Sequence, residues 1–76
     1  MNQQELNHQT AVNWITTELS VLKRTIGEQN ASAAARSVIV LAMLLGVITV
    51  DEKQAYEAQI DALYADYNAK LAGFAA

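Results

Sequence analysis

Hydrophobic and polar positions alternate with a helical period in the N-terminal third of the chain. Large aliphatic side chains recur there every three or four residues, which aligns them along one side of a helix; they are Val12, Ile15, Leu19, Leu22 and Ile26. Gly27 follows this pattern, and glycine is common at helix C-termini. We therefore predict a helix from about Gln9 to Thr25 or Ile26, preceded by a flexible N-terminus over residues 1–8.

A nearly continuous apolar run occupies residues 38–50 and reads VIVLAMLLGVITV. It is shorter than the roughly 20 residues that a membrane-spanning helix needs. The run predicts a second helix over about residues 31–45, whose polar residues all lie in its first half. Because its second half has no polar face, we expect this helix to be the central and most buried one, with Leu41 and Leu44 covered. A 76-residue chain has little else to cover such a helix, so the expected partner is a second copy.

Local signals mark both ends of the second helix and the start of a third. Asn30 or Ser32 is the expected N-cap, and Gly46 is the expected end because glycine accepts the left-handed conformation that closes a helix. Thr49, three residues after Gly46, and Glu52 have the spacing of a capping box, in which each side chain accepts a hydrogen bond from the backbone N–H of the other residue. The short link between the two helices predicts a tight αα-hairpin.

The third segment, from about Val50 to Ala72, has two stripes on roughly opposite sides of a helix. The larger side chains are Tyr56, Ile60, Leu63, Tyr67, Leu71 and Phe74. The smaller stripe consists of Ala55, Ala58, Ala62, Ala65, Ala69, Ala72 and Ala76. An unbroken alanine ridge allows a second helix to approach closely, but alanine also fills solvent-facing positions because it is the best helix former. Both interpretations remain open.

The fold class that follows is all-α, with one helical domain over residues 9–76. Two longer amphipathic helices would flank a central apolar helix in each protomer. The chain has no proline, which suits an all-helical fold. It has no cysteine and one histidine, so neither disulfides nor a zinc site can stabilise so small a domain. Only 17% of its residues are charged, against about 25% in ordinary domains. Both observations favour a homo-oligomer, as a dimer or a larger helical bundle.

The distribution of charge argues against nucleic acid as a partner. The net charge is −3, and all of it arises in residues 51–76, which repel phosphate backbones and anionic lipid. The N-terminal residues lack the charged and apolar regions of a signal peptide. We therefore expect a cytoplasmic protein.

Candidate chemistry is sparse. The single histidine, His8, precedes the predicted helix, and we expect it to be partly exposed or disordered rather than a catalytic base. Glu57 and Asp61 lie one helical turn apart and could share a proton or a divalent cation, although such a pair is more often a solvated helix face. We expect no catalytic residue, metal site or cofactor, and an enzyme is the least favoured class.

One polar group could hold an anion. Lys23, Arg24 and Arg36 flank the link before the second helix, and Ser32 lies at the start of that helix. Free N–H groups at a helix N-terminus favour negative charge. The group is therefore a possible site for a small phosphate-bearing ligand, and the alternative is an ordinary capped helix with scattered cations.

Two residues of the first segment lie off its main apolar stripe. Trp14 and Val21 are about 120° away from it, and tryptophan is enriched at binding hot spots. Trp14 is either an interface anchor or a cover for the edge of the core. The complete set of interface candidates is Trp14, Val21, Leu41, Leu44, Ala58, Ala62 and Ala65.

The preferred function is that of a small non-enzymatic helical oligomer that binds other proteins. Adaptors, inhibitors and accessory factors, including those of bacteria and their phages, have this kind of composition. The first alternative is an oligomer that binds or sequesters a small anionic ligand. The second is a small subunit of a larger complex that docks through its apolar central helix.

Overall fold

A computed structural model describes residues 1–75, which form three helices and no strand within that range. These are α1 (Gln3–Thr25), α2 (Ala33–Leu44) and α3 (Val50–Ala75). The predicted all-helical fold with three helices is confirmed. Ala76, the last member of the alanine stripe, lies outside the described residues.

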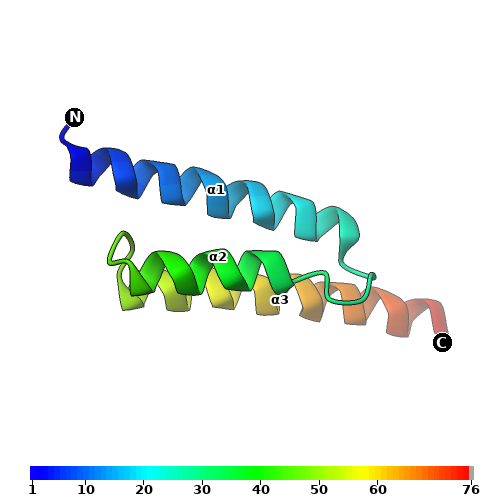
Figure 1. The fold of residues 1–76 in the computed structure, drawn as a ribbon. Helices are drawn as coiled ribbons and strands as arrows, with labels where there is room; N and C mark the ends of the chain where they lie inside the picture. Colours follow the sequence, from blue (N-terminus) through cyan, green and yellow to red (C-terminus); the bar gives the residue numbers. More distant parts are fainter. Residues whose placement is uncertain (76) are drawn as a thin grey trace.

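The three helices lie roughly parallel to one long axis (Figure 1). The Cα atoms extend over 53 × 19 × 19 Å, and α2 packs against both α1 and α3. Successive helices run in opposite directions, so the N-terminus and the C-terminus lie at opposite ends of the molecule (Figure 1). The C-terminal part of α3 extends beyond the other two helices.

The first helix begins at Gln3, so the predicted start near Gln9 was wrong. The side-chain Oδ1 of Asn2 accepts a hydrogen bond of 2.8 Å from the backbone N–H of Glu5, which is an N-cap. Glu5 also lies in the first turn, where its negative charge interacts favourably with the positive end of the helix dipole. Hydrophobic periodicity did not reveal this start because the first two turns are almost entirely polar.

The end of α2 at Gly46 agrees with the prediction. Gly46 has a φ of 76°, and no atom beyond the two adjacent residues lies within 4 Å of where its Cβ would be. The N–H of Gly46 donates to the carbonyl of Met43 and the N–H of Val47 donates to that of Ala42, both at 3.0 Å. These two bonds form a Schellman motif, which satisfies the last carbonyls of the helix. At the other end of α2 the N-cap position is Ser32, but its side chain makes no capping hydrogen bond.

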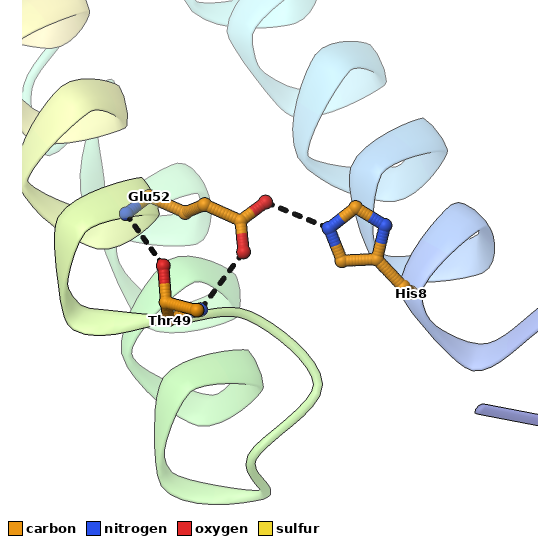
Figure 2. Close-up of polar contacts among 3 residues, drawn as sticks. All are labelled: His8, Thr49 and Glu52. Atoms are coloured by element: carbon orange, nitrogen blue, oxygen red, sulfur yellow. Dashed lines mark hydrogen bonds and ion pairs between the residues drawn. The ribbon is translucent and has the colours of Figure 1, made fainter. Parts of the chain in front are cut away.

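The predicted capping box at the start of α3 is present (Figure 2). The backbone N–H of Thr49 donates to Oε1 of Glu52 at 2.9 Å, and the backbone N–H of Glu52 donates to Oγ1 of Thr49 at 3.0 Å. The second carboxylate oxygen of Glu52 lies 2.7 Å from Nε2 of His8 on α1. One glutamate therefore begins α3 and also links it to α1.

Apolar side chains from α1, α2, α3 and the link after α2 form the core. Its buried members are Ala11, Ile15, Leu22, Ala35, Ile39, Ala42, Ile48 and Ile60. The main stripe of the first helix faces this core, as predicted. Among residues 1–74 no polar or charged residue is buried, so apolar packing alone holds the interior.

Within one chain α2 is covered on one side only, and the prediction that a second copy covers the rest stays a prediction. Ile39 has no exposed surface, but Leu41 is 55% exposed and Leu44 is 71% exposed. Two neighbouring helices of a three-helix chain cover only one side of a third. The large stripe of α3 is exposed at its C-terminal end, where Leu71 is 48% and Phe74 is 90% exposed.

Candidate protein-interaction surface

The side of α2 that faces away from the core is an exposed apolar surface. We call it the outward face of α2, and it consists of Ala33, Ala34, Ser37, Val40, Leu41, Leu44 and Leu45. At 100° per residue these positions cover one continuous side of the helix and of its C-cap residue. Leu45, like Leu44, is about 70% exposed. The larger side chains lie at the C-terminal end of this face and the smaller ones at its N-terminal end.

A shallow groove extends the outward face of α2 onto α1. It has a volume of about 320 Å³, and its apolar lining includes Trp14, Val38, Leu41 and Leu45. Trp14 is 57% exposed and stands at the rim. Two helical turns further along α1, Val21 lies on the same side of the helix and is also exposed. The structure therefore brings four of the seven predicted interface residues to one side of the molecule.

Little charge interrupts this surface. Between residues 33 and 45 the only charged side chain is Arg36, which borders the outward face of α2 on the side away from Trp14. Its Nη2 lies 3.5 Å from Oδ1 of Asp61 on α3, and its Nε donates to Oγ of Ser32 at 3.2 Å. The guanidinium is thus oriented along α2 and toward α3, and the apolar surface beside it carries no unpaired charge.

The four anion-site candidates do not converge on one cavity. Arg36 and Ser32 bind each other, as described above, while Lys23 lines a different groove, between α1 and α3. Arg24 is exposed in the last turn of α1. Asp66 lines the groove that contains Lys23, which makes it less attractive for an anion.

The three alanines among the interface candidates lie away from the outward face of α2. Ala58, Ala62 and Ala65 are exposed on α3, and Ala62 lines the groove between α1 and α3. Their exposure is compatible with either an interface or a solvent-facing stripe. The role of the alanine stripe therefore stays a prediction.

The carboxylates of α3 that were considered as a pair bind different cations. Oε1 of Glu57 lies 2.7 Å from Nζ of Lys53, whereas Asp61 pairs with Arg36. Within the described part of the chain, no three histidine, cysteine, aspartate or glutamate side chains could hold a metal ion together. No helix there has both the length and the apolar character to span a membrane.

The contact between His8 and Glu52 is a polar feature that the sequence did not reveal. The two residues are 44 positions apart, and Figure 2 shows the imidazole and the carboxylate pointing toward each other. The hydrogen bond from His8, together with that from the Thr49 backbone, lowers the pKa of Glu52. Burial, with the negative charge of Glu52 nearby, raises the pKa of Tyr56. The expectation that His8 is partly exposed is confirmed, since 45% of its side chain is accessible.

Comparison of the chain with protein-family models, curated proteins and solved structures finds no match. The function is therefore inferred from the residues and their geometry alone.

Proposed function

We propose that this chain is a non-enzymatic protein-interaction module that binds another protein chain through the outward face of α2. The observation that supports this most directly is the exposure of Leu41, Leu44 and Leu45, each more than half accessible on one uncharged surface. Solvent-exposed leucines occur singly on many proteins, but a continuous apolar patch marks a binding surface. Trp14 at the edge of the groove adds a side chain of the type that dominates binding energy at interfaces.

The energetic incentive for such binding is substantial. Full burial of a leucine side chain is worth about 1.5–3 kcal/mol. Three leucines that are roughly two-thirds exposed could therefore contribute on the order of 3–6 kcal/mol of further burial free energy if a partner covered them. A partner that covers them would recover part of this free energy, after the cost of association. The three-helix protomer, with α2 and α3 as an αα-hairpin, serves as the scaffold that presents the face.

Site-specific photo-crosslinking in the cells that produce the protein tests the proposal. A benzophenone amino acid replaces Leu44, and in a matched control it replaces Gln54, an exposed polar residue of α3. We expect a protein adduct of discrete mass from position 44, none from position 54, and loss of the adduct when Leu41→Gln is added. Absence of an adduct at position 44, or equal adducts at both positions, would contradict the proposal.

A further inference from the structure

We infer that the outward face of α2 binds the same face of a second copy of this chain, with the two α2 helices antiparallel. This inference rests on the proposed function and names the partner. It comes from the distribution of side-chain sizes along the face. Its N-terminal half exposes Ala33, Ala34 and Ser37, and its C-terminal half exposes Leu41, Leu44 and Leu45.

Antiparallel pairing matches these sizes residue by residue. When the twofold axis lies at the level of Ile39, Ala34 is level with Leu44 of the second copy, and Ser37 is level with Leu41 of the second copy. Ala33 is then level with Leu45 in the same way. Each exposed leucine therefore meets a small side chain, as in packing of ridges into grooves. A parallel arrangement would instead place leucine against leucine at one end and leave a gap at the other.

The charges agree with this self-pairing. An isologous interface brings each surface patch against itself, so a patch with charges of one sign would repel its copy. The outward face of α2 carries no charge. Arg36 borders it and keeps its own partner Asp61, so neither residue is left unpaired when the second copy binds.

The size of the outward face of α2 is that expected for a dimer of modest affinity. A standard interface covers about 800 Å² on each partner, which is about 15% of the 5284 Å² accessible surface of this chain. The outward face of α2 spans residues 33–45, a length of about 20 Å, and Trp14 and Val21 extend it sideways. Because the face is little more than one short helix, we expect a small interface with a dissociation constant on the order of micromolar.

Sedimentation of the purified chain from about 0.05 μM to about 100 μM covers the concentrations over which a micromolar dimer dissociates. We expect the mass to rise from one chain to two. Leu44→Gln should raise the dissociation constant at least about tenfold, the change that corresponds to about 1.4 kcal/mol. Leu71→Gln is the matched control, because Leu71 is about half exposed but belongs to α3 and not to the outward face of α2, and it should leave the constant unchanged. A single-chain mass at every concentration, or equal effects of both variants, would overturn the inference.

Introduced cysteines test the orientation, since the chain has none of its own. In an antiparallel dimer a disulfide can join Ala34→Cys to Leu44→Cys of the other copy. The axes of packed helices are about 8–10 Å apart and Cα atoms lie about 2.3 Å from each axis, so facing Cα atoms come within the roughly 5–6 Å that a disulfide spans. Two copies of the same variant hold their cysteines about 15 Å apart along the axis. The two variants are mixed, and a tag on one of them distinguishes disulfide dimers that contain both variants from those that contain one variant twice. We expect at least about fivefold more of the dimer with both variants, a factor that corresponds to about 1 kcal/mol.

Same-variant adducts in equal or greater amount would overturn the antiparallel arrangement. Ala33→Cys with Leu45→Cys provides a second pair if circular dichroism shows that either first variant is unfolded. Failure of this inference is distinct from failure of the proposed function. A position-44 photo-adduct with a different protein, combined with a monomeric purified chain, would support the function and overturn the dimer; absence of any adduct would overturn both.

Discussion

The two sides of α2 have similar amino acids and opposite environments. Ile39 has no exposed surface, whereas Leu44, five residues further along the same helix, is 71% exposed. Both are large aliphatic residues, so hydrophobicity does not distinguish the inner side from the outer one. The difference arises because α1 and α3 both pack against α2, and its buried residues Ala35, Ile39 and Ala42 all lie on one side of it. The inner side contributes to folding, and in our proposal the outer side contributes to binding.

The inner side should give the largest effect on stability. We expect Ile39→Ala to lower the free energy of unfolding by about 2–5 kcal/mol, because it leaves a cavity among fully buried residues. A domain of this size has a total stability of roughly 4–11 kcal/mol, so the urea midpoint should fall sharply. Val40→Ala at the adjacent, partly exposed position is the control. Equal losses of unfolding free energy in both variants would show that Ile39 and Val40 contribute equally to stability, which would contradict the assignment of an inner and an outer side of α2.

The turn after α2 fixes where the helix ends relative to α3. Gly46→Ala should cost about 1 kcal/mol, because the left-handed conformation at this position is unfavourable for a residue with a Cβ. No atom beyond the two adjacent residues lies within 4 Å of the added Cβ, so the cost is conformational. Gly73→Ala, within α3 and equally open, is the matched control and should be neutral or stabilising. Thermal melts of both variants measure these changes. A similar loss of stability in each would contradict a left-handed conformation at Gly46.

The capping box should give a smaller and pH-dependent effect. The pKa of Glu52 is lowered in the folded state, so its contribution is complete above about pH 4.3, the ordinary value for glutamate. The contribution is then lost as the pH falls through the lowered value. Glu52→Gln can keep the capping hydrogen bonds but not the titration. We expect the free energies of unfolding of the two proteins to differ by about 0.2–1 kcal/mol at pH 6 and to converge as the pH falls to 3. A constant difference across this range would exclude Glu52 as the titrating group.

The outer side should give the smallest effect on the isolated chain. Leu44→Gln should change the free energy of unfolding by less than about 0.5 kcal/mol when measured at low protein concentration. At high concentration the wild-type chain should gain apparent stability through association, and the variant should not. Urea titrations at two concentrations separate the two contributions. A large loss for the variant at low concentration would show that Leu44 belongs to the core of the protomer.

The elements themselves could be predicted because their signals are local. Gly46 and the pair Thr49 and Glu52 fixed the end of α2 and the start of α3 through the backbone conformation and hydrogen bonds of adjacent residues. The periodic spacing in the first segment identified its core-facing side. The start of α1 was missed because Asn2 caps a polar turn that shows no hydrophobic period.

The surface could be predicted only in part. Trp14 and Leu44 were recognised as candidates, but the sequence did not show that Ala62 lies on a different side of the molecule. The pairing of Arg36 with Asp61, which separates it from Lys23, was likewise invisible because it depends on how α2 packs on α3.

The sequence by itself therefore determined the helices, the left-handed end of α2 and the capping box, since each depends on residues within a few positions of one another. Only the tertiary structure decided which side of α2 is exposed. A helix that is apolar all round carries no polar residue to mark its solvent side, so the choice between Ile39 and Leu44 is made by the helices that pack against it. The same holds for His8 and Glu52, which come together across 44 residues because α1 and α3 are brought side by side at the end where α3 begins.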